Sequence, residues 1–304
     1  MHMNEIINLM LAPFCECLVL VGIHSYLGLH VIRRGIIFVD LAFAQIAALG
    51  LTVGFLFGIM PDSVAAYWIS LAFTLAGALI FSLFRSMESR IPQEAIIGLV
   101  YAIAASLMII VIDRAPHGAE HIKEILTGDL LFVKWDFVIS AAVVYSIIGI
   151  FHYIYRDKFL AITENHGGKN TRAARAGERI AQNPSGMKLW DFLFYASFGV
   201  IITHSVRTAG VLLVFVFLVA PAIFTSLFWN GWRDQLIAGW ILGTIVSAGG
   251  LFISYYADMP CGPSVIMFYG AALFAAVPVY KFITKSDRGG EDEPAIAAES
   301  PNNG

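Results

Sequence analysis

Residues 33–50 read RRGIIFVDLAFAQIAALG, and this stretch decides the fold because two arginines stand directly before an apolar run of spanning length. Such runs recur along the whole chain. Of its 304 residues, 58% are hydrophobic and 13% are charged, and the mean hydropathy is +0.75. Soluble domains have about 45–50% apolar and about 25% charged residues. The composition therefore predicts an all-α integral membrane protein and leaves no room for a soluble catalytic domain.

A spanning helix needs about 20 mostly apolar residues. Nine segments meet this requirement: 6–32, 36–59, 63–84, 93–112, 136–155, 189–206, 209–229, 235–257 and 262–283. With nine alternating spans, all but four of the 19 Lys and Arg residues fall on one side of the membrane. The positive-inside rule makes that side cytoplasmic. We therefore expect the N-terminus outside, the C-terminus in the cytoplasm, and one transmembrane domain over residues 1–285.

Two connecting segments are long and polar: 113–135 outside and 156–188 inside. The inner one contains HGGKNT, but Thr163 stands where a phosphate-binding P-loop requires its first glycine, so we do not expect this chain to hydrolyse ATP. The run TRAARAGER in the same loop is either a short basic helix or a solvated segment. The tail 286–304 is rich in Gly, Pro, Ser and acidic residues and is predicted to be disordered.

Several ionisable residues lie inside the predicted spans, where a charge costs at least about 2.5–3.5 kcal/mol and often marks function. His24 and Asp40 lie on either side of the arginine pair and are expected at a similar membrane depth. Carboxylate and imidazole groups that meet from adjacent helices form a ligand set for transition metals. The alternative is that they hydrogen-bond neighbouring backbone. The intramembrane candidates are Glu16, His24, His30, Asp40, Glu94 and His152.

The outer segment contains HGAEH, with His117, Glu120 and His121. In a helix, the two histidines would face one direction with the glutamate beside them. These letters also match the H-x-x-E-H pattern of some metalloproteases. A short loop that contains Gly118 and offers no evident third ligand is a poor scaffold for a protease. The segment is therefore either a vestibule that receives metal ions or an ordinary polar loop.

Four segments together resemble one family, the membrane-spanning permease subunits of ABC importers for zinc, manganese and iron. They are GLHVIRRGIIFVDLAFAQIAALG, EAIIGLVYAIAASL, ILTGDLL and AGVLLVFVFLVAPAIFTSLF, in the order the family has them, and the resemblance runs from about residue 12 to 283. It implies a helical permease in the bacterial plasma (inner) membrane, paired as a homodimer. Two ATP-binding cassette subunits would dock on the loop 156–188, and an extracytoplasmic protein would deliver the ion.

The resemblance also implies roles for individual residues. The family has an aspartate and, four positions later, a histidine early in helix two; here Asp40 matches and Ala44 replaces the histidine. We hypothesise that His24 supplies the missing ligand and that Glu94 assists. Within the loop, contact with the ATPase would fall on TRAARAGER, and the residues expected there are Thr171, Arg172, Arg175, Glu178 and Arg179.

The sequence therefore predicts the permease subunit of an ATP-driven importer of a divalent metal ion, with zinc favoured over manganese and iron. The chain itself is expected to be no enzyme, to hold no permanent cofactor and to bind no nucleic acid. A secondary transporter coupled to protons or sodium would also bury Asp, Glu and His, but its inverted repeats with broken helices are not evident. A purely structural membrane protein would explain the topology but not the clustered ligands.

Overall fold

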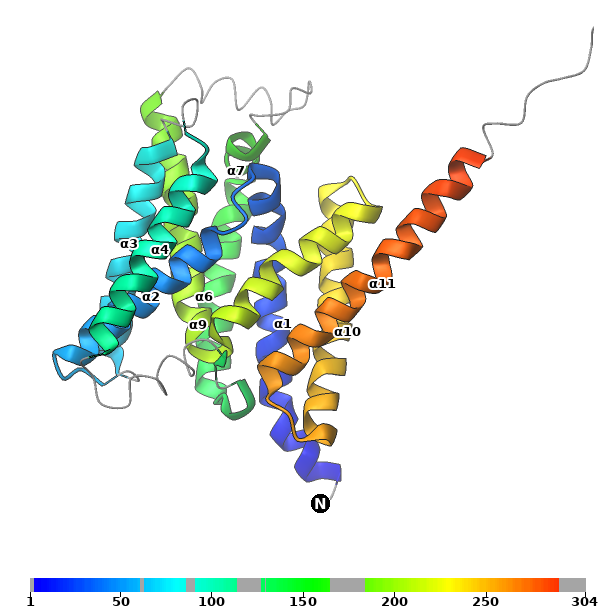
Figure 1. Ribbon diagram of the computed structural model, residues 1–304, viewed down its shortest axis with the longest axis horizontal. Coiled ribbons are helices and arrows are strands. Elements are labelled where there is room, and N and C mark those ends of the chain that lie inside the picture. The colour runs from blue at the N-terminus through cyan, green and yellow to red at the C-terminus, as the bar shows by residue number, and fades with distance from the viewer. Residues whose placement is uncertain are drawn as a thin grey trace, which may run out of the picture.

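The protein is all-helical over the residues that its computed structural model describes, which are 3–60, 63–85, 91–113, 127–128, 130–164 and 184–289. Figure 1 shows the helices as a bundle, with the end of the last helix extending away from it. The elements are α1 (Met3–Arg34), α2 (Val39–Leu56), α3 (Val64–Arg85), α4 (Gln93–Ile112), η1 (Leu130–Phe132), α6 (Trp135–Ile154), α7 (Arg156–Glu164), α9 (Pro184–Phe228), α10 (Trp232–Ala257) and α11 (Cys261–Gly289).

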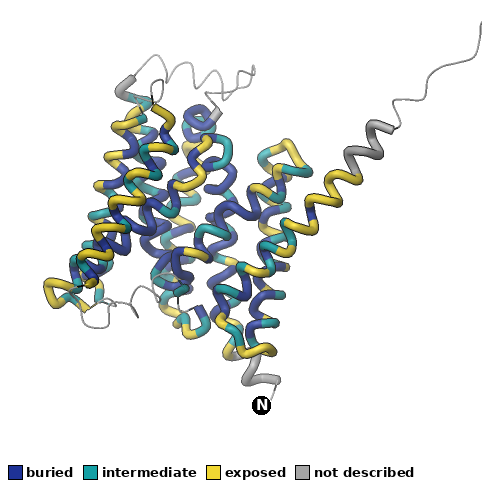
Figure 2. Tube along the Cα trace, in the orientation of Figure 1, coloured by how far each residue is buried: buried dark blue, intermediate teal, exposed yellow. Residues whose placement is uncertain are grey.

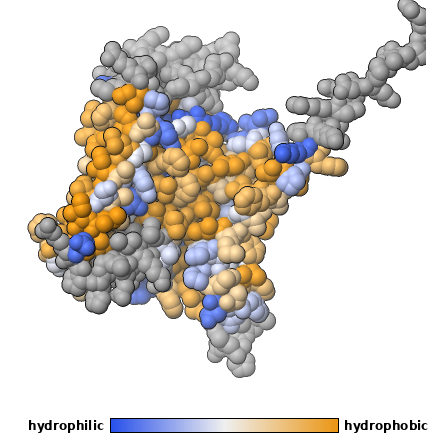
Figure 3. Space-filling model, viewed as in Figure 1, coloured by the Kyte–Doolittle hydropathy of each residue, from blue (hydrophilic) through white to orange (hydrophobic). Residues whose placement is uncertain are grey.

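Burial separates inner helices from outer ones. Helices α1, α2 and α9 contribute most of the buried core, whereas α4, α6 and α11 are largely exposed (Figure 2). The exposed faces are nevertheless apolar, as Figure 3 shows for one side of the molecule. They carry Leu99, Ile109, Ile147, Phe274 and Phe282. The outer surface is apolar, while the core contains several buried polar side chains. This distribution fits a protein that is surrounded by lipid.

A glycine-dependent turn joins α1 to α2. Gly35 has a φ of +66°, and the Gly35 N–H bonds to the Ile32 carbonyl while the Ile36 N–H bonds to the Val31 carbonyl, both at 3.1 Å. This pair of bonds is the Schellman ending of a helix, which places a residue in the left-handed region just past the last turn. Glycine adopts that conformation without a Cβ penalty. The α1–α2 corner is therefore tight and defined.

Helix α9 contains two membrane crossings. Its 45 residues exceed the length of one span, and Gly210, with φ 76° and ψ 162°, interrupts its helical backbone. Before the break α9 runs antiparallel to α1, since Asp191 meets Arg34 and Thr208 meets Glu16. After the break it runs parallel to α1, since Leu218 lies against Gly28 and Asn230 against Arg33.

Eight helices of the described residues are long and apolar enough to span a membrane, and one of them, α9, contains two crossings. The nine predicted crossings are therefore present among these residues. The predicted ends 206 and 209 bracket the region just before the break. Two boundaries differ from expectation. The loop 156–188 begins and ends in helix, with α7 at one end and the start of α9 at the other, and α11 continues past residue 285 to Gly289.

One close approach of α1 to α9 depends on the lack of a side chain at Gly28. A Cβ at Gly28 would collide with the Leu218 carbonyl oxygen and touch Ala222 at 3.2 Å. Small residues at such crossings allow helix backbones to approach closely in membranes. By contrast, a Cβ at Gly22 on the same helix would meet no atom within 4 Å.

We predict that Gly28→Ala destabilises the protein by about 1–3 kcal/mol, because a backbone carbonyl cannot move aside as a flexible side chain would. Gly22→Ala is the matched control and should keep stability or raise it by up to about 1 kcal/mol, because alanine favours the helix over glycine. The measurement is the unfolding transition of both variants in detergent, together with the fraction that elutes as a single species. Equal stability of the two variants would contradict the close crossing.

Candidate functional site

Asp40 is a buried carboxylate in a membrane-spanning helix. It stands in the first turn of α2, its exposed fraction is 1%, and neither of its oxygens has a hydrogen-bond partner among the described residues. The positive end of the α2 dipole offsets part of its charge. A carboxylate held in this way has oxygens free to accept a cation. The side-chain oxygen of Gln45, one turn further along the same helix, is also buried without a partner.

Glu94 lies at the same end of α2. Its Oε1 accepts a hydrogen bond from the Phe38 N–H at 2.9 Å, and Phe38 is the residue that caps α2. The other oxygen, Oε2, is buried and has no hydrogen-bond partner among the residues described. Its neighbour Gln93 donates to the Tyr195 hydroxyl at 2.7 Å, which ties the start of α4 to α9. The structure thus brings both predicted acids, Asp40 and Glu94, to the first turn of α2.

His24 lies against residues of α1 and α9. Its Nδ1 donates to the Leu20 carbonyl at 2.9 Å, and its Nε2 lies 3.3 Å from the Ser205 hydroxyl on α9. Ser205 also meets the Tyr145 hydroxyl of α6. These contacts place the imidazole between α1, α6 and α9, with its Nδ1–H bonded to the backbone and its Nε2 facing Ser205. No recorded contact joins it to Asp40, so the pairing of these two residues stays a prediction.

Glu16 and His30 also serve the packing of α1. Glu16 accepts a hydrogen bond from Thr208 at 2.8 Å beside the α9 break, and its second oxygen has no partner in the described part of the chain. His30 Nδ1 lies 2.7 Å from the Thr163 hydroxyl. That hydroxyl donates to the Phe159 carbonyl, so it accepts from His30 and leaves the His30 Nε2 lone pair unpartnered. These two residues lie toward opposite ends of the helix.

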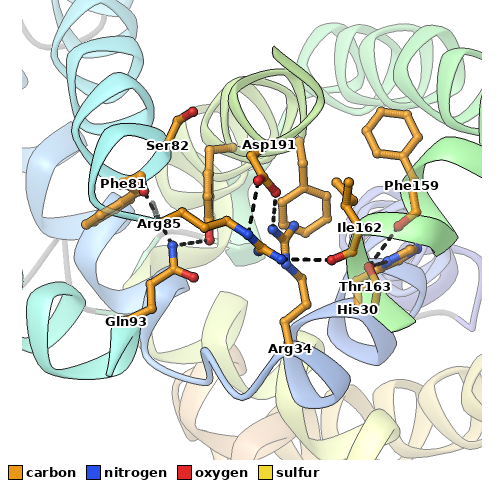
Figure 4. Close-up of polar contacts among 12 residues, drawn as sticks. His30, Arg34, Phe81, Ser82, Arg85, Gln93, Phe159, Ile162, Thr163 and Asp191 are labelled. Atoms are coloured by element: carbon orange, nitrogen blue, oxygen red, sulfur yellow. Dashed lines mark hydrogen bonds and ion pairs between the residues drawn. The ribbon is translucent and has the colours of Figure 1, made fainter. Parts of the chain in front are cut away.

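A buried ionic cluster joins the ends of three helices on the side of the α1–α2 turn (Figure 4). Asp191 of α9 accepts from Arg34 at 2.5 Å through Oδ1 and from Arg85 at 3.0 Å through Oδ2. Arg85 also donates to the Ile162 carbonyl of α7 at 2.9 Å. Arg34 packs against the rings of Phe194 and Tyr195. Sequence analysis missed this cluster, although a lone aspartate within an apolar run was a signal for it.

The remaining candidates lie outside the described residues. They are His117, Glu120 and His121 of the outer segment, and Thr171, Arg172, Arg175, Glu178 and Arg179 of the inner loop. Within the described part of the chain, no group of three or more His, Cys, Asp and Glu side chains is arranged to hold a metal ion. The described carboxylates of Glu16, Asp40 and Glu94 are instead distributed along the bundle.

Residues 6–280 match the family described as the ABC 3 transport family. The "Probable iron transport system membrane protein" of Haemophilus influenzae is 21% identical over 276 residues, covering 89% of this chain and 91% of that protein. The "Manganese transport system membrane protein MntC" of Listeria monocytogenes is 24% identical over 268 residues, covering 84% of this chain and 88% of that protein.

Two solved structures share the fold. PsaBC from Streptococcus pneumoniae, solved in complex with Fab, aligns with a TM-score of 0.70 at 18% identity, covering 90% of this chain and 95% of that one. An inward-facing metal-chelate type ABC transporter aligns with a TM-score of 0.63 at 14% identity, covering 92% of this chain and 90% of that one. The family match spans nearly the whole chain, and the helices and crossings agree with it: this multi-pass membrane protein belongs to the ABC 3 transport family.

Proposed function

We propose that this chain is the permease subunit of an ATP-driven importer for a divalent transition-metal ion in the bacterial plasma membrane. It works as a homodimer with two ATP-binding cassette subunits, which hydrolyse ATP, and with an extracytoplasmic protein that delivers the ion. The match to the ABC 3 transport family and the metal transport systems named for its relatives support this assignment.

Asp40 is the observation that carries the proposal. A charged carboxylate in a spanning segment costs several kcal/mol unless something compensates it. Asp40 is 1% exposed and has no side-chain or backbone partner among the described residues. A hydrated cation that passes the first turn of α2 would supply the missing opposite charge. Glu94, with one free oxygen beside the same turn, would offer the ion a second ligand.

The free donors at this turn are oxygens, and that bears on the metal. Carboxylate oxygens suit manganese, whereas imidazole suits zinc, copper and iron. The imidazole of His24 donates to the α1 backbone and faces Ser205 of α9, and none of these contacts involves Asp40, so the ligands found at this turn are poorer in imidazole than expected from the sequence. The relatives are named for manganese and iron. We therefore treat manganese, iron and zinc as equal candidates for the transported ion. Competition between the three ions in an uptake assay would rank them.

We predict that Asp40→Asn reduces ATP-dependent metal uptake at least about tenfold, because the amide keeps the size of the side chain but removes its charge. The measurement is uptake of radiolabelled manganese and zinc into proteoliposomes that hold the chain, its ATPase subunits and the delivery protein. Asp136→Asn, the same change at an exposed position in the first turn of α6, is the control. Unchanged uptake in Asp40→Asn would remove Asp40 from the pathway.

A second prediction separates this assignment from a secondary transporter. Uptake should stop when ATP is replaced by a non-hydrolysable analogue and should persist when an ionophore collapses the proton and sodium gradients. The reason is that ATP hydrolysis, and not an ion gradient, would drive alternating access. The opposite result, in which uptake follows the gradient and ignores ATP, would assign the chain to the secondary transporters.

A further inference from the structure

The last turn of α7 is bound to the bundle by side chains from two other helices. Arg85 of α3 donates to the Ile162 carbonyl at 2.9 Å, and His30 of α1 donates to the Thr163 hydroxyl at 2.7 Å. Figure 4 shows both bonds on neighbouring residues of α7. Helix α7 forms the beginning of the inner loop. Any displacement of the C-terminal end of α7 must therefore move Arg85 and His30 or break these bonds.

The other flank of the loop is bound by the same arginine. Arg85 Nε lies 3.0 Å from Asp191 Oδ2, near the beginning of α9, while its Nη2 holds Ile162. One planar guanidinium therefore bridges the two helices that enter and leave the inner loop. Its donors have fixed relative directions, which an ammonium group cannot reproduce.

Asp191 also connects the loop flanks to the α1–α2 corner. Its second oxygen binds Arg34, the last residue of α1, which immediately precedes the tight turn at Gly35. Asp40 follows in the first turn of α2. The side chains of Arg34 and Asp191 are 1% and 2% exposed, so water neither screens this pair nor replaces it readily.

We propose that Arg85, Asp191 and Arg34 form a coupling unit that transmits movement of the loop flanks to the α1–α2 turn and so to Asp40. These are positioning residues, since none of them touches the ion. The inference rests on the proposed function, in which ATPase subunits act on the inner loop. It goes further by naming the side chains that carry their motion into the bundle.

The test compares Arg85→Lys with Arg33→Lys in reconstituted complexes. Arg33 directly precedes Arg34 on α1. Its guanidinium, however, contacts Gln235 at 2.9 Å and the Trp232 ring at 3.8 Å, both on α10. The readout is the number of ions taken up per ATP hydrolysed, with the amount of assembled complex measured separately. We expect Arg85→Lys to lower that ratio at least about fivefold, the lower end of typical coupling effects. Arg33→Lys should leave the ratio unchanged.

A purely structural role would reduce uptake and ATP hydrolysis together and keep their ratio, and that result would overturn the proposal. Should Arg85→Lys fail to assemble, Arg34→Lys changes the other arginine of the same unit and keeps a positive charge beside Asp191, and an unchanged ratio there would overturn the proposal equally. Failure of the wild-type chain to bind the ATPase subunits or to take up metal would instead refute the proposed function on which the inference rests.

Discussion

The structure depends on one buried carboxylate, Asp191, held between two arginines. Placing three charges inside a membrane protein is costly, and removing one partner of such a group typically costs about 3–5 kcal/mol because another is left uncompensated. The cluster therefore fixes the ends of α1, α3 and α9 relative to one another. Within the described part of the chain, the Nε and Nη1 atoms of Arg34 have no hydrogen-bond partner, while the guanidinium packs on the rings of Phe194 and Tyr195.

Asp40 is treated in the opposite way by the same bundle. Among the charged residues that are buried in the described part of the chain, Glu16, Arg34 and Asp191 each hold at least one hydrogen bond, whereas Asp40 holds none. A fold that satisfies Asp191 so fully could have satisfied Asp40 as well. A buried carboxyl group without a partner persists only where function needs it or where a group absent from the single chain completes it.

The sequence predicted the helices better than the contacts. Hydropathy placed every span. It also separated 189–206 from 209–229, because the combined apolar run is too long for a single crossing of the bilayer. Charge cost also identified Asp40 and Glu94 as residues that need an explanation. Depth arguments could not orient His24, since position along a helix axis does not fix which neighbour the side chain faces. The partners of the Arg34–Asp191 pair are 157 residues apart, and no periodicity connects residues at that distance.

Asp191 and Asp40 are connected through Arg34 and the short α1–α2 turn. Arg34 ends α1, Gly35 turns the backbone, and Asp40 lies in the first turn of α2, so a shift of Asp191 reaches the free carboxylate through one tight corner. A flexible linker would absorb such a shift, but a Schellman ending with both hydrogen bonds formed has few soft torsions. Glu94 binds the Phe38 N–H at the far side of this corner, so α4 must follow it too. The proposed coupling therefore runs from a carboxylate that is fixed by two arginines to one that has no partner among the described residues.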